Sequence, residues 1–442
     1  MIVMNMRFLD PTSLQLVFKM GGTHLFPRRG LENYGPHESP TGEKITIRFV
    51  YPKNYRTVVS KFKNILENGG NRFPGFENVY RIPIEISDDI VLDYKDYRGI
   101  ELPKKLAKVV EEDREITSKP IYVVVVHPYP RWQKRNPYYV FKSHLLKCKI
   151  MSQMIRTDVL QGRNLDEIAY NVANAIFAKA GGRPWKLLTK IPSFSGTADL
   201  VITIGFGLTR VPKDPAQRIF DRYAGYVIVM NEEGIMSHLK TFVTQYEKTI
   251  MRRKLIECIR DALYSALREH VGNIDVIFHY SSKELSIEEE QSIKQLLEQI
   301  SKDQSVRINY AIIRIITHPL YKVFMDTDDG YPLMASYVEI GDRLLLIYTV
   351  GKLYEKITPL GVPRPILISI RSSNIDIQEI DKEVFVYSVI GTARMNWRNT
   401  GIFNREPTTI RYARDIAYMV ASFNEIVNLD PAYLPEEIPW FL

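Results

Sequence analysis

Short apolar runs alternate with amphipathic stretches over the first third of the chain. Apolar runs at Ile45–Tyr51, Val79–Ile84 and Ile121–Val126 predict strands, and the stretches around Val58–Leu66 and Lys104–Glu112 predict helices. Strands that alternate with helices form mostly parallel sheets with right-handed crossovers. This part of the chain therefore predicts a doubly wound, Rossmann-like α/β domain, in which ligands bind beyond the carboxyl ends of the strands.

Two further helices follow the third strand. Asn136 is a favourable N-cap for a helix over Tyr138–Lys149, and a short strand or loop at Ile150–Ile155 leads to a second helix over Leu165–Ala180. Side chains four residues apart share one face of a helix. Tyr138 and Lys142 are therefore expected to lie side by side.

The later part of the chain predicts a different order of elements. Three successive strands are followed by helix, strand, helix and further strands, the order of an RNase H-like fold. The predicted strands are Leu200–Phe206, Ala224–Val229, Met236–Phe242, Ile274–Phe278, Ile308–Ile316, Tyr337–Ile340, Arg343–Tyr348 and Pro365–Ile370. The predicted helices are Thr249–His270, a segment opened by the capping box Ser286-x-x-Glu289, Lys382–Thr392 and Thr408–Ile426.

These patterns divide the chain into three parts. Residues 1–44 form an N-terminal arm that contains a Gly/Pro-rich loop, Phe26–His37, and is expected to pack on the last domain. Residues 45–190 form the Rossmann-like domain, and residues 191–442 form the RNase H-like domain. The fold class is therefore α/β, with one domain of each kind.

Composition supports a globular chain. Its 442 residues are 45% hydrophobic and 25% charged, enough apolar content for two or three packed domains. The longest apolar run, Ile121–Val126, is much shorter than the roughly 20 residues of a membrane helix, so no direct membrane insertion is expected. Two cysteines, Cys148 and Cys258, cannot build a disulfide framework, and a cytoplasmic location is expected.

Positive charge is concentrated in one segment. The net charge is +8, and residues 116–157 contain no Asp or Glu but carry eight Lys and Arg residues interleaved with aromatic ones: Lys119, Arg131, Lys134, Arg135, Lys142, Lys147, Lys149 and Arg156. Such a segment fits either a phosphate-binding surface or a solvated basic face.

The polar residues of this region match a known family. Tyr138-x-x-x-Lys142, Gln153, Asn171 and Lys179, together with the apolar end Pro439–Leu442, resemble short prokaryotic Argonautes that consist of MID and PIWI domains only. The similarity extends over nearly the whole chain and includes the Pro27–Pro36 stretch and the Phe73-Pro-Gly-Phe76 turn. It implies a MID-like domain at residues 45–190 and a PIWI-like domain at 191–442.

The resemblance implies a pocket for the 5′-terminal phosphate of a guide strand. Tyr138, Lys142, Gln153 and Lys179 would line it, with Asn171 near a following phosphate. Two ammonium groups can offset the charges of a terminal phosphate, the amide adds a directional donor, and an aromatic ring can stack on the first base.

The resemblance also assigns the Leu442 carboxylate to a metal site. In the family this group helps to hold Mg²⁺ (or Mn²⁺) between guide phosphates, and hard cations prefer oxygen ligands. The alternative is an apolar tail that only fills a groove.

The carboxylates that cleave target strands in this family are replaced here. Gly207, Tyr280 and Arg414 occupy three of the four positions, and Glu247 matches the fourth only loosely. Two-metal hydrolysis needs several carboxylates. We therefore expect no nuclease activity, and expect His279 to be packed in the core.

The resemblance implies a defence protein that binds a guide RNA (DNA is possible), recognises complementary target DNA, and acts with a separately encoded APAZ-domain protein and an effector. Two alternatives stay open at this stage. The first is a guide-dependent endonuclease with unconventional metal ligands, and the second is an interaction scaffold with a vestigial pocket.

Overall fold

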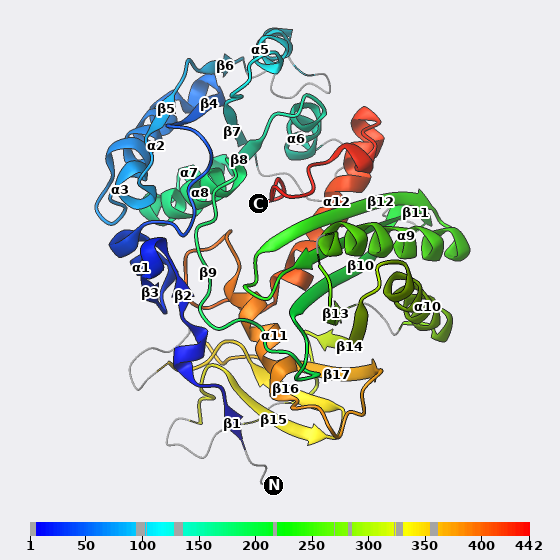
Figure 1. Ribbon diagram of the computed structural model, residues 1–442. Helices are drawn as coiled ribbons and strands as arrows, with labels where there is room; N and C mark the ends of the chain where they lie inside the picture. Colours follow the sequence, from blue (N-terminus) through cyan, green and yellow to red (C-terminus); the bar gives the residue numbers. More distant parts are fainter. Residues whose placement is uncertain are drawn as a thin grey trace.

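The computed structural model describes residues 6–93, 102, 104–127, 136–214, 219–268, 270–281, 285–321, 323, 330–353 and 361–442. Two α/β domains lie side by side, each built on its own sheet (Figure 1). We call them the first domain and the second domain in chain order. The mixed α/β class predicted from the pattern of apolar runs is confirmed.

The first domain has a parallel sheet in the order β5-β4-β7-β8, with β6 also paired to β4. Its strands are β4 (Ile45–Pro52), β5 (Ile84–Ile86), β6 (Ile90–Leu92), β7 (Ile121–Val126) and β8 (Ser152–Arg156). Its helices are α2 (Arg56–Asn68), α3 (Phe76–Tyr80), α5 (Lys104–Arg114), α6 (Pro137–Lys147), α7 (Thr157–Leu160) and α8 (Leu165–Lys179).

Strand β7 lies in the middle of this sheet and consists of an uninterrupted apolar run. All six of its residues are buried, and Val123 and Val124 belong to hydrophobic clusters on opposite faces of the sheet. A parallel strand that is covered on both faces of the sheet has no solvent-exposed face, so all of its side chains can be apolar.

One predicted strand of this domain is wrong. Residues 76–80 form the helix α3, and the strand β5 starts only at Ile84. Phe76, Val79 and Tyr80 are buried at helical spacing, and Arg81 ends the helix with a left-handed φ of 57°. The apolar residues therefore follow a helical and not an extended period.

The second domain has a nine-stranded sheet in the order β1-β15-β16-β17-β14-β13-β10-β11-β12. Its strands include β10 (Leu200–Asp214), β11 (Ile219–Met230), β12 (Met236–Gln245), β13 (Asn273–Tyr280), β14 (Arg307–Ile316), β15 (Ser336–Gly341), β16 (Leu344–Tyr348) and β17 (Ile366–Ser373). The antiparallel unit β10-β11-β12 continues into the parallel pairs β10-β13 and β13-β14. This arrangement confirms the RNase H-like fold.

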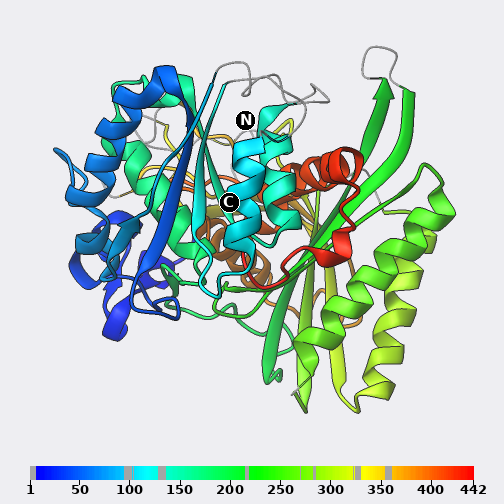
Figure 2. The same cartoon turned by 90° about the horizontal axis from the view of Figure 1, so that it is seen from above.

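Helices cover both faces of this sheet. Helices α9 (Lys248–Leu267) and α10 (Ile287–Asp303) lie on the outer face, and α11 (Glu383–Arg394) and α12 (Thr408–Val427) lie on the other. The predicted capping box at Ser286 and Glu289 is present at the start of α10. Figure 2 shows α12 between the sheet and the first domain, where it packs against α6. Helix α12 therefore lies at the interface between the two domains.

The N-terminal arm packs on the second domain, as expected, and also contacts the first domain. Strand β1 (Arg7–Phe8) extends the large sheet beside β15, and β2 (Leu16–Val17) pairs with β3 (Thr23–His24) and with β9 (Lys186–Leu187). Helix α1 (Pro27–Tyr34) packs against α3 of the first domain.

The expected loop at residues 26–37 is mostly helical. Pro27 is the first residue of α1, and the helix ends at Gly35 with a φ of 80°. Proline at the start and glycine just past the end are favourable helix boundaries. Pro27 and Gly35 therefore mark the two ends of a helix and not a loop.

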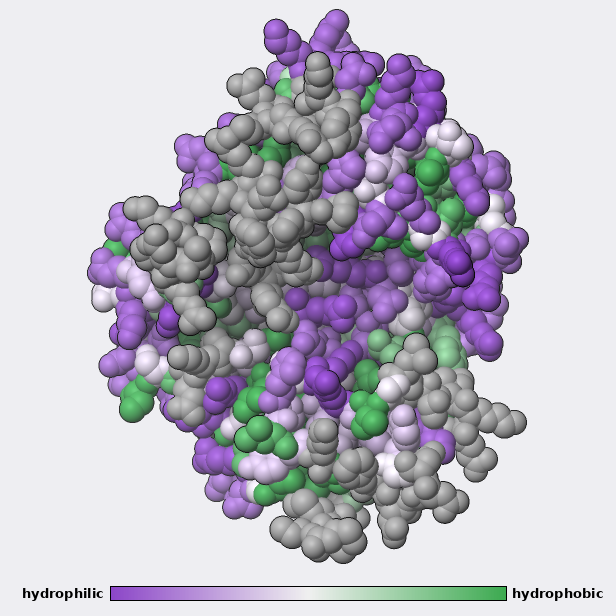
Figure 3. Space-filling view, turned by 180° about the vertical axis from the view of Figure 1, so that it is seen from behind, coloured by the Kyte–Doolittle hydropathy of each residue, from purple (hydrophilic) through white to green (hydrophobic). Residues whose placement is uncertain are grey.

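No helix within the described residues is long and apolar enough to cross a membrane. On the face opposite to that of Figure 1, hydrophilic side chains gather across the hollowed centre, and hydrophobic residues form small separate groups (Figure 3).

A glycine fixes the distance between α12 and the sheet. A Cβ on Gly205 of β10 would lie 2.4 Å from the Thr409 main-chain oxygen. Because main chain cannot move aside as a side chain can, we expect Gly205→Ala to lower the free energy of unfolding by about 1–3 kcal/mol. Denaturant unfolding would measure this loss. Gly341→Ala is the control, since its Cβ would meet no atom closer than 3.9 Å, and an equal loss in both variants would contradict the expected contact.

Candidate anion-binding site

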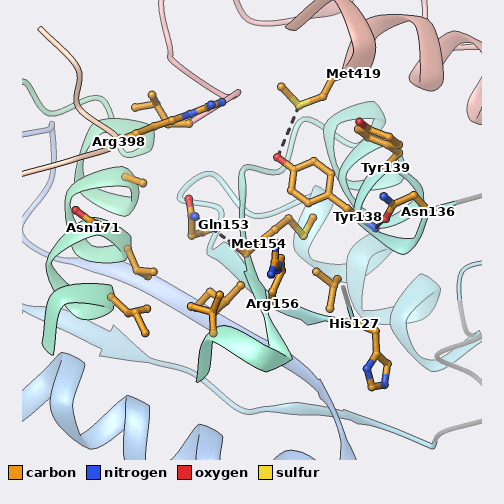
Figure 4. Close-up of a pocket in the computed structure, with 17 residues that line it drawn as sticks. His127, Asn136, Tyr138, Tyr139, Gln153, Met154, Arg156, Asn171, Arg398 and Met419 are labelled. Carbon is orange, nitrogen blue, oxygen red and sulfur yellow. Dashed lines mark hydrogen bonds between the residues drawn. The ribbon is translucent and has the colours of Figure 1, made fainter. Parts of the chain in front are cut away.

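A cavity of about 450 Å³ opens where the two domains meet. It lies between α6, β8 and α8 of the first domain and is closed by Arg398, Met419 and Leu442 of the second domain (Figure 4). The Asn136 side chain accepts a hydrogen bond from the Tyr138 main-chain N–H at 3.0 Å, which confirms the predicted N-cap of α6. That cap begins the helix that brings Tyr138 to the cavity and Lys142 to the Ser152 oxygen beside it.

Tyr138 forms an aromatic wall of the cavity. Its ring meets Tyr139 edge-on at 5.4 Å between ring centroids, and its hydroxyl donates to the Met419 Sδ of α12 at 3.8 Å. Figure 4 shows the ring across the cavity from Asn171 on α8. The Asn171 Oδ1 accepts the Thr400 main-chain N–H at 3.2 Å, so this side chain also ties α8 to the second domain.

Two buried lysines meet at one main-chain oxygen. Lys142 and Lys179 are 1% and 2% exposed, and their Nζ atoms donate to the Ser152 oxygen at 3.3 and 2.9 Å. Lys179 Nζ also donates to Gln153 Oε1 and to the Leu442 main-chain oxygen, both at 2.5 Å. Of the six residues assigned from the sequence, four line the cavity, namely Tyr138, Gln153, Asn171 and Leu442. Lys142 and Lys179 are buried beside it, and Lys179 contacts the lining residues Gln153 and Leu442. Residues 128–135 of the basic segment lie outside the described residues.

Arg398 is a third cation that the sequence did not point to. It lies between α11 and α12, its guanidinium donates to the Phe441 main-chain oxygen, and it stacks over the Tyr412 ring at 5.1 Å. It also lines the cavity. Arg398 lies between two predicted helices and belongs to no motif of regular spacing. The sequence therefore did not indicate that it lies at the cavity.

The cavity favours an anion. Burial, followed by the positive charge of Arg398, lowers the pKa of Lys142 to about 7. Burial, Lys142 and Arg398 together lower the pKa of Lys179 well below its usual value. No Asp or Glu side chain is among the described residues that line the cavity. An anionic ligand would relieve the repulsion between these cations and favour their protonated forms.

The oxygens that the resemblance assigns to a Mg²⁺ (or Mn²⁺) site lie beside Lys179. The Leu442 oxygen and Gln153 Oε1 already accept hydrogen bonds from this ammonium group. Within the described part of the chain, no group of three or more His, Cys, Asp or Glu side chains could hold a metal ion. One oxygen of Leu442 is thus recorded on Lys179, and the metal at this carboxylate stays a prediction.

The position that Gly207 occupies is covered by a tyrosine. Gly207 lines a second cavity, of about 270 Å³, near the start of α12. A Cβ on Gly207 would lie 2.7 Å from the Tyr226 ring, which comes from the paired strand β11. The Tyr226 hydroxyl donates to the Thr409 main-chain oxygen at 3.2 Å, and the side chain is buried.

The other replaced positions do not gather around Gly207. Tyr280 is buried on the opposite face of the sheet, where its ring stacks on Phe206 at 5.8 Å, and Ser281 lines the cavity instead. Alternation of side chains along a strand separates Tyr280 from Gly207. Glu247 is exposed at the N-cap of α9 and is not among the lining residues. Arg414 lies in α12, and its side chain is outside the described part.

His279 is packed in the core. Its Nδ1 lies 2.9 Å from Thr409 Oγ1 and its Nε2 lies 3.1 Å from Ser388 Oγ. Burial lowers its pKa to about 3, so the ring is neutral at physiological pH.

Fold and cavity together define a two-domain α/β protein with a buried cationic pocket at the domain interface. Residues 123–425 match the Piwi domain family, which is more than half of the chain. The chain therefore belongs to the Piwi domain family and is Argonaute-like.

Individual relatives agree with this assignment. The chain is similar to the Piwi protein of Archaeoglobus fulgidus, with 23% identity over 94% of this chain and 93% of that protein. It is also similar to the protein argonaute of Aquifex aeolicus, with 30% identity over 26% of this chain and 15% of that protein.

Solved structures share the fold. Drosophila Piwi gives a TM-score of 0.69 at 13% identity, and Clostridium butyricum Argonaute, bound to a guide DNA and a 19-mer target DNA, gives 0.69 at 14% identity. Aquifex aeolicus Argonaute with externally bound siRNA gives 0.64 at 16% identity. The alignments cover 99% of this chain but only 55–56% of those chains, so the chain spans about half of their length.

The buried lysine predicts a pH-dependent stability. Between pH 7 and 10.5 the unfolded chain holds a proton that folded Lys142 has lost, so the free energy of unfolding of the ligand-free protein should rise with pH. We expect Lys142→Met to remove up to about 1.4 kcal/mol per pH unit of that slope. Unfolding measured at several pH values would check this. Equal slopes for the wild type and Lys142→Met would contradict a depressed pKa at this lysine.

Proposed function

We propose that this Argonaute-like protein binds the 5′-phosphorylated end of a guide nucleic acid in the cavity at the domain interface. The observation that supports this most directly is that Lys142, Lys179 and Arg398 lie close enough to repel one another, beside a cavity with no acidic side chain among its described lining residues. Three cations can offset a terminal phosphate dianion, and charge-assisted hydrogen bonds to phosphate are among the strongest that side chains make.

Other residues that line the cavity would also contact the guide. Tyr138 offers an aromatic ring for the first base, and stacking on such a ring tolerates any base. Gln153 and Asn171 add amide groups near the backbone of the guide. Such contacts hold phosphates and ends, and base pairing with the guide then reads the target sequence.

We propose further that the protein does not cut its target. Carboxylates are needed to hold the two metal ions of RNase H-like hydrolysis. The cavity at Gly207 has Glu406 as the carboxylate among its described lining residues, together with His318, and Tyr226 covers the position of Gly207. A protein that binds a target without cutting it needs another component to produce an effect.

We therefore propose that the protein signals through partners. Guide RNA is the proposed ligand, with guide DNA as the alternative, and complementary DNA is the proposed target. A separately encoded APAZ-domain protein and an effector would complete a cytoplasmic defence system against invading nucleic acid. The family resemblance supports these proposals, and the chain spans only about half of the solved Argonautes.

Two rival functions make different predictions. A guide-dependent endonuclease would use the cavity at Gly207 with unconventional ligands, for which Glu406 and His318 are the available side chains. An interaction scaffold with a vestigial pocket would not distinguish phosphorylated from unphosphorylated oligonucleotides.

The pocket predicts a strict preference for an end phosphate. Oligonucleotides with a 5′-phosphate should bind at least about tenfold more tightly than the same oligonucleotides with a 5′-hydroxyl, because one or more charge-assisted hydrogen bonds are worth about 1.5–3 kcal/mol each. In the double variant Lys142→Met plus Lys179→Met this difference should vanish, as measured by fluorescence anisotropy.

Methionine keeps an unbranched apolar side chain of similar length and removes the ammonium group, both its charge and its hydrogen bonds. Lys147→Met is the matched control, since Lys147 lies on the same helix but is exposed and donates to the Val427 main-chain oxygen. An unchanged preference in the double variant, or an equal loss in the control, would refute the pocket.

The second cavity predicts no cleavage. A guide-loaded protein incubated with a complementary target and Mg²⁺ or Mn²⁺ should leave the target intact on a denaturing gel, because the carboxylates that bind two metal ions are replaced. Guide-dependent products that disappear in Glu406→Gln would instead establish the endonuclease.

A further inference from the structure

The neutral polar side chains of the interdomain cavity offer N–H groups to a ligand. Its described lining residues include three amide side chains, Asn136, Gln153 and Asn171. The oxygen of each one already accepts a hydrogen bond: Asn136 Oδ1 from the Tyr138 main-chain N–H at 3.0 Å, Gln153 Oε1 from Lys179 Nζ at 2.5 Å, and Asn171 Oδ1 from the Thr400 main-chain N–H at 3.2 Å. The amide groups that remain for a ligand are therefore hydrogen-bond donors.

Asn136 is the amide whose orientation is fixed most firmly. It is the N-cap of α6 and is only 5% exposed. Because its Oδ1 caps the helix, the amide cannot turn over to present this oxygen to the cavity without breaking the cap. Its Nδ2 donates to no residue in the described part of the chain. A largely buried NH₂ group in this position favours a ligand that supplies an acceptor.

Asn136 lies at the end of the cavity where the far edge of a base would lie. In Figure 4 the Tyr138 ring stands between Arg398 and Asn136, and all three line the cavity. The proposed phosphate site is on the Arg398 side. A base that stacks on Tyr138 and is tethered to that phosphate therefore points its far edge toward Asn136.

The far edge of a base carries the substituent that separates two classes of bases. In a pyrimidine, C4 lies across the ring from the nitrogen that bears the sugar, and C6 of a purine lies similarly far from the sugar. The substituent there is an oxygen in uracil, thymine and guanine, and an amino group in cytosine and adenine. The NH₂ group of Asn136 can donate to the oxygen, whereas an amino group would meet it donor against donor.

We infer that Asn136 selects the first base of the guide by donating from Nδ2 to this exocyclic oxygen. Guides that begin with uracil (or thymine) or guanine are then preferred over guides that begin with cytosine or adenine. Asn136 is thus both the helix cap and the residue that reads the base. This inference rests on the proposed function, because the base reaches Asn136 only when the 5′-phosphate is bound in the same cavity.

Binding of guides that differ only in the first base tests the inference. Four 5′-phosphorylated RNA oligonucleotides, identical after the first position, are compared by competition in fluorescence anisotropy. Uracil and guanine should bind about 3- to 10-fold more tightly than cytosine and adenine, the worth of one neutral hydrogen bond. Hypoxanthine has the oxygen of guanine without its 2-amino group, so it should bind as guanine does.

Two substitutions keep the helix cap and change only what faces the base, because Ser and Asp cap helices about as well as Asn. Asn136→Ser removes the NH₂ group, and the preference should fall below about twofold. Asn136→Asp replaces the donor by an acceptor, and cytosine and adenine should become the preferred bases. Asn171→Ser is the matched control across the cavity, and it should change the affinity for all four oligonucleotides by the same factor.

The comparison uses ratios of affinity within one protein, so a partly unfolded variant or a general loss of affinity does not affect it. Equal wild-type affinities for the four oligonucleotides, tighter binding of cytosine and adenine, or an unchanged preference in Asn136→Ser would overturn the inference. The proposed function fails separately, if oligonucleotides with a 5′-hydroxyl bind as tightly as those with a 5′-phosphate.

Discussion

The arrangement of this protein depends on buried positive charge that has few partners within the chain. Removing an ammonium group from water is costly unless hydrogen bonds compensate, and Lys142 and Lys179 share a single main-chain oxygen at Ser152. Lys179 has two further acceptors, Gln153 Oε1 of the first domain and the Leu442 oxygen of the second domain. The domain interface and the pocket are therefore one structure, since the pocket is incomplete until the end of the chain reaches it.

Several contacts keep that end in place. Trp440 and Phe441 are buried, their rings meet edge-on at 5.7 Å, and Arg398 holds the Phe441 main-chain oxygen. Lys240 of β12 pairs with Glu436 at 2.5 Å. Apolar burial supplies most of the stabilisation, because a half-exposed ion pair contributes little. Trp440 and Phe441 are thus part of the hydrophobic core, and the Leu442 oxygen that follows them lies at a polar site.

The cavity at the domain interface and the cavity beside Gly207 differ in their chemistry. At the domain interface, cations converge and acidic side chains are missing from the described lining; beside Gly207, an uncharged tyrosine fills space near the sheet. Tyr226, which lines the second cavity, donates to the Thr409 main-chain oxygen, and Gly205 lets this part of α12 lie close to the sheet. Helix α12 in turn carries Met419 to the first cavity. Residues of α12 therefore line both cavities, and the packing of this helix on the sheet contributes to both.

The sequence by itself determined the local features: the apolar core strand β7, the capped helix α6 with Tyr138 and Lys142 on one face, and the order of strands that defines the second domain. Periodicity and caps depend on neighbours within a few residues, so they can be read along the chain. Only the tertiary structure decided that Arg398 joins the pocket and that Tyr226 covers Gly207. Such contacts follow from how two packed domains face each other, and no local pattern encodes them.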